Sequence, residues 1–278
     1  MHTATNQDSI IELREVHKRF GAVRVLDGVS LSIPQGKTTV VIGESGTGKS
    51  VLLKHIVGLL RPDKGEVFFH GSRVDHLSEE ELVPIRRRMG LLFQMGALFD
   101  SMTVSENIAF PILEHTERSE EEMDETVSMK LRMVGLDGYQ ARRPGELSGG
   151  QKKRVALARA IAMDPEMVLY DEPTTGLDPV RADVINELIL KLQRELHVTS
   201  VVVTHDMTSA YKVGDRIVML HEGKIIADGP PDWIRSCEDA QVRRFVDGHA
   251  NPEDLEALNH GAMETPKRRN VNKSKRQK

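Results

Sequence analysis

The sequence predicts an α/β fold, with a parallel sheet whose two faces are covered by helices. Three observations predict it. Short apolar runs at residues 38–42, 89–93, 167–170 and 200–203 have the length of buried strands. Stretches with helical spacing lie between them, and strands that alternate with helices form parallel sheets. Residues 95 to about 147 interrupt this alternation, because they contain two helix starts and no strand pattern, so we expect a helical insertion there.

The elements on either side of this insertion follow from local patterns. Residues 10–16, 23–26 and 29–33 mix apolar and polar positions like half-exposed strands, and Asp27-Gly28 is expected to break the chain between the last two. The opening therefore predicts a small, mostly antiparallel sheet. The remaining expected elements are a strand at 66–70, a short helix that ends at Arg88, helices at 148–163 and 180–196, and strands at 216–220 and 224–227.

Residues 43–50 form the most informative motif. They join the apolar run 38–42 to a helical segment at 51–57, which is the setting of a phosphate-binding loop. Glycines allow backbone N–H groups to turn toward phosphate oxygens, and the helix start adds its positive dipole end. We expect Lys49 to reach the β- and γ-phosphates and the Ser50 hydroxyl to bind Mg²⁺. The expected nucleotide-binding residues of this loop are Gly43, Glu44, Ser45, Gly46, Thr47, Gly48, Lys49 and Ser50.

Two carboxylates follow the apolar run 167–170. At the carboxyl end of a parallel strand beside the phosphate loop, Asp171 can hold the shell of a magnesium ion. Glu172 can orient the water that attacks the γ-phosphate or accept its proton. Two acids after a strand are often only a loop, but the glycine loop upstream favours the functional interpretation.

Residues 147–151, Leu-Ser-Gly-Gly-Gln, precede an excellent helix-forming stretch. Ser148 is a good N-cap, and the pair Gly149-Gly150 exposes backbone donors at the positive end of the helix. A simple capped helix explains Ser148 and leaves the two glycines without a purpose. We therefore expect a second anion site, formed by Ser148, Gly149, Gly150 and Gln151, that closes over a nucleotide held by another copy of the chain.

Two single residues complete the expected site. His205 follows the apolar run 200–203 and would share a sheet edge with Asp171 and Gln94, so we expect it to contact the γ-phosphate rather than to be a structural histidine. Phe20 can stack on an adenine ring, and core packing is the alternative.

Composition limits the remaining classes of function. The single cysteine, Cys237, excludes an intramolecular disulfide framework, and no apolar run approaches the ~20 residues that span a bilayer. Residues 265–278 carry seven Lys or Arg and no acid, which leaves the rest of the chain with a net charge of −11 against −4 for the whole. An acidic body argues against a nucleic-acid-binding surface. The basic tail is expected to be disordered and solvated.

Together these motifs resemble the nucleotide-binding subunit of ABC transporters over residues 10–230. The resemblance implies a P-loop NTPase with a RecA-like parallel core sheet, an antiparallel β-subdomain and a helical subdomain at about 95–147. It implies a cassette at 10–248, preceded by a flexible segment 1–9 and followed by an extension at 249–278. It implies a head-to-tail dimer with two ATP between the copies and Asp178 at the dimer interface. It also implies that Phe20 stacks on adenine. Gln94, which lies in the Q-loop, would bind Mg²⁺ together with Ser50 and Asp171. Glu172, His205 and Lys49 would be catalytic.

A narrower resemblance concerns the ATPases associated with Mla and MCE systems, through residues 48–54, 93–111 and 242–248. It implies a chain that is cytoplasmic and peripheral on the inner face of the cell membrane. There it would power a permease that moves phospholipid or another hydrophobic substrate, with an MCE-type substrate-binding protein acting indirectly. Leu98, Phe99 and Met102 could form an apolar cleft for a short permease helix.

Three alternatives remain open. The chain could serve another class of transporter, or it could be a soluble ABC ATPase that acts on ribosomes or DNA. A soluble protein of that kind usually has two cassettes or long coiled coils, and this sequence has neither. A kinase or GTPase that uses only the phosphate loop would leave residues 147–151 and His205 unexplained.

Overall fold

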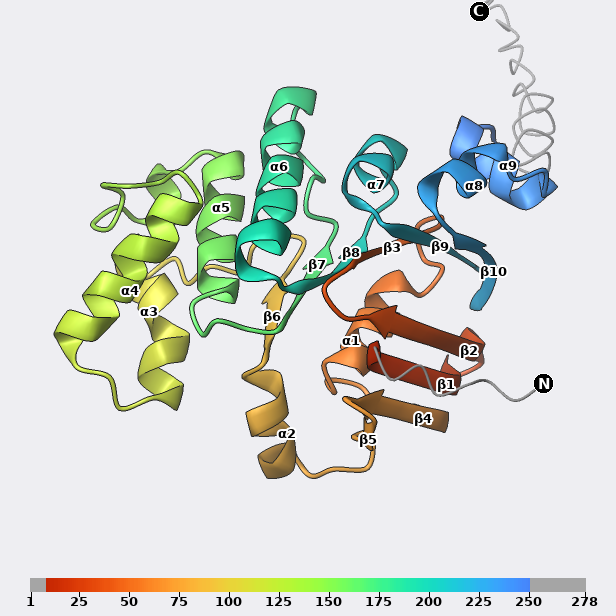
Figure 1. Cartoon of the computed structure of the whole chain (residues 1–278), viewed down its shortest axis with the longest axis horizontal. Helices are drawn as coiled ribbons and strands as arrows, with labels where there is room; N and C mark the ends of the chain where they lie inside the picture. The colour runs from red at the N-terminus through yellow and green to blue at the C-terminus, as the bar shows by residue number, and fades with distance from the viewer. Residues whose placement is uncertain (1–8, 251–278) are drawn as a thin grey trace, which may run out of the picture. The chain divides into compact units, whose positions relative to one another are not determined.

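The computed structural model describes residues 9–250, which form two sheets flanked by helices (Figure 1). The first sheet is antiparallel and has the strand order β2-β1-β4-β5. Its strands are β1 (Ser9–Phe20), β2 (Val23–Pro34), β4 (Lys64–Phe69) and β5 (Ser72–Arg73). Strand β2 is longer than expected, because Asp27 and Gly28 form a bulge within it instead of a break, and β1 pairs with it as far as Phe20. Gly28 has a φ of +74°, a conformation that a glycine adopts without strain.

The second sheet has six strands in the order β10-β9-β3-β8-β7-β6. Its strands are β3 (Thr38–Ile42), β6 (Met89–Leu92), β7 (Met167–Asp171), β8 (Thr199–Val203), β9 (Arg216–His221) and β10 (Lys224–Gly229). All neighbours in this sheet pair in parallel except β9 and β10. The carboxyl ends of β3, β6, β7 and β8 therefore lie along one edge, where ligands bind in parallel sheets.

Helices cover both faces of the parallel sheet, as Figure 1 shows. Helix α1 (Lys49–Ile56) lies between the two sheets, and its Leu52, Leu53 and Ile56 join apolar side chains from both sheets in one core cluster. The opposite face carries α6 (Pro179–Leu196) and α7 (Met207–Val213). Helices α2 (Glu79–Arg86) and α8 (Pro231–Ser236) flank the sheet near β6 and β10.

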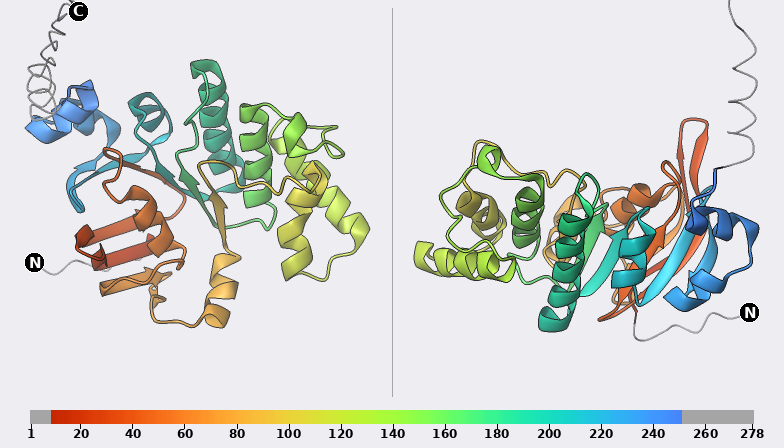
Figure 2. Two further views of the ribbon diagram at one scale, coloured as in Figure 1. Left: turned by 180° about the vertical axis from the view of Figure 1, so that it is seen from behind. Right: turned by 90° about the horizontal axis from the view of Figure 1, so that it is seen from above.

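The helical insertion is present between β6 and β7. It contains α3 (Val104–His115), α4 (Glu120–Met133) and the 3₁₀ turn Pro144–Glu146, and it packs on α5 (Gly149–Ala160), as the rear view in Figure 2 shows. Helices α3, α4 and α5 each begin with a capping box, which explains why their start points could be expected from the sequence.

The chain divides into two compact units between Cys237 and Glu238. Of the second unit, the described residues include α9 (Ala240–Asp247), which ends at Gly248 in a left-handed conformation. The cassette boundary expected at residue 248 stays a prediction. The expectations for the first residues and for the basic tail concern residues 1–8 and 251–278, which lie outside the described part of the chain.

Candidate nucleotide-binding site

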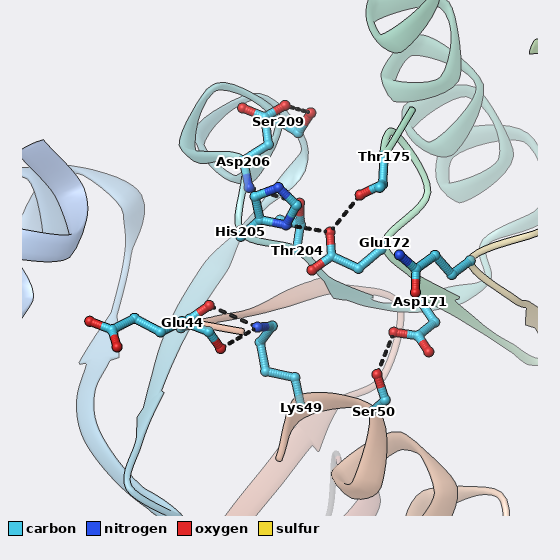
Figure 3. Close-up of polar contacts among 12 residues, drawn as sticks. Glu44, Lys49, Ser50, Asp171, Glu172, Thr175, Thr204, His205, Asp206 and Ser209 are labelled. Carbon is cyan, nitrogen blue, oxygen red and sulfur yellow. Dashed lines mark hydrogen bonds and ion pairs between the residues drawn. The ribbon is translucent and has the colours of Figure 1, made fainter. Parts of the chain in front are cut away.

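The predicted phosphate loop and the residues that follow β6, β7 and β8 share one cavity of about 420 Å³. This cavity lies at the carboxyl edge of the parallel sheet. Figure 3 shows side chains from three of these segments facing one another. The lining residues are Phe20, Val25, Ser45, Gly46, Gly48, Lys49, Ser50, Val51, Gln94, Glu172 and His205. The fold thus brings together residues of both sheets that are up to 185 positions apart in the sequence, Phe20 and His205.

Two glycines of the loop are required by close backbone contacts. A Cβ atom on Gly43 would lie 2.2 Å from the carbonyl oxygen of Leu220, and one on Gly48 would lie 2.8 Å from the carbonyl oxygen of Val25. Their φ angles are +148° and +102°, which side chains disfavour. The loop is therefore held against β9 on one side and against β2 of the antiparallel sheet on the other.

Lys49 is the buried cation of the site and is only 7% exposed. Its Nζ atom donates to the carbonyl oxygens of Gly43 at 2.8 Å and of Glu44 at 2.9 Å. Burial lowers the pKa of the Lys49 ammonium, and the nearby carboxylates of Glu172 and Asp171 oppose that shift. Helix α1 begins at this lysine without a side-chain cap, so its first N–H groups remain available to an anion.

Ser50 and Asp171 form the candidate metal site. The Ser50 hydroxyl donates to Oδ1 of Asp171 at 2.9 Å, and burial raises the pKa of that carboxyl group. Gln94 lines the same cavity as Ser50. Within residues 9–250 no cluster of three or more His, Cys, Asp or Glu could hold a metal by itself. A hydroxyl, one carboxylate and an amide oxygen fit Mg²⁺, which binds oxygen atoms and takes its other ligands from water and phosphate.

Glu172 is held in place by unusually many partners. It is 9% exposed and has a φ of +50°, a left-handed conformation that costs about 1–3 kcal/mol in a residue with a side chain. Its N–H donates to the Val203 carbonyl oxygen at 2.9 Å. Its Oε2 atom accepts from Oγ1 of Thr175 at 3.0 Å and lies 2.9 Å from Nδ1 of His205 (Figure 3). These contacts fix the carboxylate in the wall of the cavity.

Phe20, at the end of β1, is 48% exposed and lines the cavity beside the phosphate loop. Its ring has Lys18 Nζ at 5.7 Å from the centroid. A half-exposed aromatic face in this position can accept a planar base, and it contributes little to the core.

The residues of the expected second anion site do not line this cavity. Ser148 caps α5, and its N–H donates to Oε1 of Gln151 at 2.8 Å. Asp178 caps α6 through the Arg181 N–H at 3.0 Å. Gly149 and Gly150 open α5 and are likewise absent from the lining of the cavity. The role of residues 148–151 as a second anion site stays a prediction.

Two contacts near the site were not expected from the sequence. Thr175, which begins the D-loop at 175–178 in the resemblance to ABC subunits, donates to the Glu172 carboxylate. Lys153 of α5 donates to the carbonyl oxygens of Gln94 and Glu172. For Lys153 a signal existed, because it shares the helix face of Ala156 and Leu157, which are buried, and a lysine on an apolar face requires a partner.

A larger cavity of about 640 Å³ lies next to the Q-loop, among α2, β6, α3 and α5. Phe99 lines it together with Phe93, Phe110 and Met163, whereas Leu98 and Met102, which we expected to share it, are not among its lining residues. The reason is the buried Asn107, which binds the N–H and carbonyl oxygen of Phe99 and turns the loop. The Phe99 ring then pairs with that of Phe110 at 5.0 Å.

The chain is similar to known proteins over most of its length. The family model described as ABC transporter matches residues 26–175. A probable ribonucleotide transport ATP-binding protein, mkl, from Mycobacterium leprae is 42% identical over 238 residues, which is 86% of this chain and 69% of that protein. The intermembrane phospholipid transport system ATP-binding protein MlaF from Escherichia coli is 41% identical over 243 residues, which is 87% of this chain and 90% of that protein.

Solved structures agree with this family. The dimeric post-hydrolysis state of the ATP-binding cassette MJ0796, bound to ADP and Pi, has a TM-score of 0.74 and 35% identity, over 80% of this chain and 98% of that one. The cbiO1 protein from Clostridium perfringens has a TM-score of 0.77 and 28% identity, over 91% and 99%. In the described part of the chain, each helix is too short or too polar to cross a bilayer. The chain therefore belongs to the ABC transporter family, and it is a nucleotide-binding ATPase subunit of a transporter.

Proposed function

We propose that this ATPase powers a permease that moves phospholipid or another hydrophobic substrate, in a system that includes an MCE-type substrate-binding protein. The single observation that carries this proposal is the likeness to the MlaF proteins, which extends over 92% of the relative from Haemophilus influenzae and 90% of that from Escherichia coli. The alignment with the mycobacterial relatives covers less of their length, 66% to 69%.

In the proposed site, Lys49 and the backbone N–H groups of residues 43–48 bind the phosphates, and Phe20 stacks on the adenine ring. Ser50, Asp171 and Gln94 would hold Mg²⁺, which would supply positive charge to neutralise the phosphates of the nucleotide. A water molecule attacks the γ-phosphorus, its proton passes to Glu172, and the bond to the ADP oxygen breaks. The His205 imidazole, fixed by Glu172 at 2.9 Å, contacts the γ-phosphate.

Two copies of the chain close around two nucleotides. The support for this step is the separation of Ser148, Gly149, Gly150 and Gln151 from the cavity that holds the phosphate loop. N–H groups at the start of α5 in one copy then face the γ-phosphate held by the other, and Asp178 lies at the junction. MJ0796, a related cassette, is a dimer with ADP and Pi.

The apolar cavity beside the Q-loop receives a short cytoplasmic helix of the permease. Phe99, which is 41% exposed, supplies an aromatic wall, and Arg159 and Arg86 border the same cavity. This contact places the ATPase on the inner face of the cell membrane. Of Leu98, Phe99 and Met102, only Phe99 lines the cavity. Leu98 and Met102 are therefore not part of the proposed contact with the permease helix.

Another transporter class is the second candidate, because the mkl relatives are named for ribonucleotide transport. The test is to purify the Glu172→Gln variant, loaded with ATP, from detergent-solubilised membranes together with any membrane subunit that binds it. Phospholipid in the complex, with dimeric ATPase, supports the proposal. Enrichment of ribonucleotide other than ATP favours the second candidate. Retention of RNA or DNA without any membrane protein contradicts both and favours a soluble ATPase.

A further inference from the structure

Lys153 joins two segments of the ATPase site that are distant in the sequence. It lies in the second turn of α5 and is only 7% exposed. Its Nζ atom donates to the carbonyl oxygen of Gln94 at 2.6 Å and to that of Glu172 at 3.1 Å. One ammonium group therefore connects the loop that follows β6 with the residue that follows β7, and it does so from a third element.

The bond to Glu172 acts on a strained piece of backbone. Glu172 has a φ of +50°, and each of its backbone polar groups has a partner outside its own loop, while its carbonyl oxygen also accepts from the Thr175 N–H at 3.3 Å. Strand β8 holds its N–H through the Val203 carbonyl oxygen, and Lys153 holds its carbonyl oxygen. Without Lys153, the carbonyl oxygen of Glu172 would keep only the longer bond from the Thr175 N–H. Because a left-handed conformation persists only where the surroundings enforce it, this loss would loosen the backbone that directs the Glu172 side chain.

Burying the Lys153 ammonium costs desolvation free energy, which indicates that its hydrogen bonds serve a purpose beyond filling space. A buried hydrocarbon would fill the space beneath α5 without a desolvation penalty, and burial lowers the pKa of the Lys153 ammonium. The carboxylates of Glu172 and Asp171 oppose that shift. The positive charges of Lys153 and Lys49 thus balance the negative charges of Glu172 and Asp171. The four hydrogen bonds that the two ammonium groups donate all go to backbone carbonyl oxygens.

The Q-loop has a second attachment to the same helix. One turn and a half after Lys153, Arg159 of α5 donates to the carbonyl oxygen of Gly96 at 2.9 Å, and its guanidinium lies 5.7 Å from the centre of the Phe99 ring. Helix α5 is therefore hydrogen-bonded at two points to the loop that connects the nucleotide cavity with the apolar cavity lined by Phe99. Of the two α5 residues that form these bonds, only Lys153 also donates to Glu172.

We propose that Lys153 is a positioning residue for ATP hydrolysis, which binds the Gln94 and Glu172 carbonyl groups into one unit so that the position of the Q-loop sets the position of the Glu172 carboxylate. This inference rests on the role proposed above for Glu172. Lys153 does not touch the nucleotide cavity and is not among its lining residues. Its effect on turnover is therefore indirect, through the geometry of the attacking water.

The test uses Lys153→Met, which keeps the length of the side chain and removes the ammonium. We expect kcat to fall about ten- to a hundredfold, as for a small misplacement of a reacting group, while the Kd for ATP stays within about threefold. Lys153→Arg keeps a buried cation with several donors and should recover most of the lost kcat. Lys191→Met is the matched control, because Lys191 also donates to a backbone carbonyl, that of Met133 at 3.0 Å, outside the site.

A thermal melt and an ATP titration accompany each variant. If Lys153→Met binds ATP normally and keeps kcat within twofold of the parent, the proposal is wrong. It is also wrong if Lys191→Met loses as much kcat, or if Lys153→Arg fails to recover activity although it folds and binds ATP. Should Lys153→Met not fold, the Arg variant decides alone: unchanged kcat supports a cation at this position, and a loss as large as that of Glu172→Gln contradicts it. Hydrolysis by Glu172→Gln at the parental rate would instead refute the proposed role of Glu172.

Discussion

Nδ1 of His205 lies 2.9 Å from Oε2 of Glu172, so the side chains that follow β8 and β7 meet directly above the edge of the parallel sheet. His205 is half-exposed and lines the nucleotide cavity, whereas Glu172 is buried. The acid therefore orients the ring, and the other ring nitrogen remains free to act on a ligand.

We predict that His205→Ala lowers kcat for ATP hydrolysis about a hundredfold or more, in the range found when a group that orients a proton transfer is removed. ATP affinity should change little, because Lys49 and the loop N–H groups bind the phosphates. Steady-state hydrolysis and nucleotide titration measure the two effects. His76→Ala, on the exposed surface near α2, is the control, and equal rates in both variants would contradict the proposed role.

Lys49→Ala should weaken ATP binding about ten- to a hundredfold, because a charge-assisted hydrogen bond to phosphate contributes about 1.5–3 kcal/mol. Isothermal titration measures the change. The control is Lys54→Ala, which removes an exposed lysine five positions further along the same helix and should leave the affinity unaltered. An equal loss in both variants would point to general electrostatics instead of a specific contact.

Phe20→Ala should weaken ATP binding about three- to tenfold, since a stacked aromatic ring contributes about 0.5–1.5 kcal/mol beyond its buried area. Affinity for inorganic triphosphate should not change, because no base is present to stack. Val23→Ala removes an exposed apolar side chain from the same hairpin and serves as the control. Parallel losses for ATP and triphosphate would argue that Phe20 acts through the fold.

Phe99→Asp should abolish capture of the permease while ATP affinity persists, because the new carboxylate would be buried in an apolar contact without a partner. Detergent pull-down with the tagged ATPase tests this outcome. Leu113→Asp places the same charge on α3 at a position that is 63% exposed and does not line the apolar cavity. If Leu113→Asp disrupts the complex and Phe99→Asp does not, the permease binds elsewhere.

Glu166 should contribute stability that depends on pH. Hydrogen bonds from Arg88 hold the pKa of the Glu166 carboxyl below its ordinary value of 4.5, and a bond from His70 adds to this. A lowered pKa in the folded state gives stability that is present above the ordinary value and is lost as the pH falls through the lowered one. At neutral pH, Glu166→Gln should therefore cost at most about 1 kcal/mol, because the side chain is partly exposed and screened.

Urea unfolding at several pH values checks the sign. The difference in unfolding free energy between the parent and Glu166→Gln should shrink as the pH is lowered below the ordinary carboxyl pKa. Glu80→Gln, on the exposed side of α2, should show no such trend. A difference that grows in acid would mean that the ion pairs of Glu166 do not account for its lowered pKa.

The strand, glycine loop and helix around residues 43–50 could be predicted because they follow one another within 20 residues; their phosphate-binding role stays a prediction. The common edge of Gln94, Asp171 and His205 also followed from short runs of the sequence, since parallel strands end on the same side. The bulge at Asp27-Gly28 did not, because it depends on pairing with β1 across the hairpin.

The lining of the apolar cavity and the contacts of Lys153 could not be predicted from short runs of the sequence. Phe99 lines its cavity only because Asn107, eight residues away, folds the loop back on itself. Lys153 meets Gln94 and Glu172 across 59 and 19 positions of sequence, through contacts that exist only once the helical insertion packs on the sheet. Helices α7 and α8 are short, at seven and six residues, and their sequence periodicity is too brief to stand out.

Gly48 of the phosphate loop lies against Val25, and Val25 belongs to the hairpin that also carries Phe20. The proposed contacts to the adenine base and to the phosphates are therefore linked through one hairpin, so a change in the position of that hairpin would alter both contacts together.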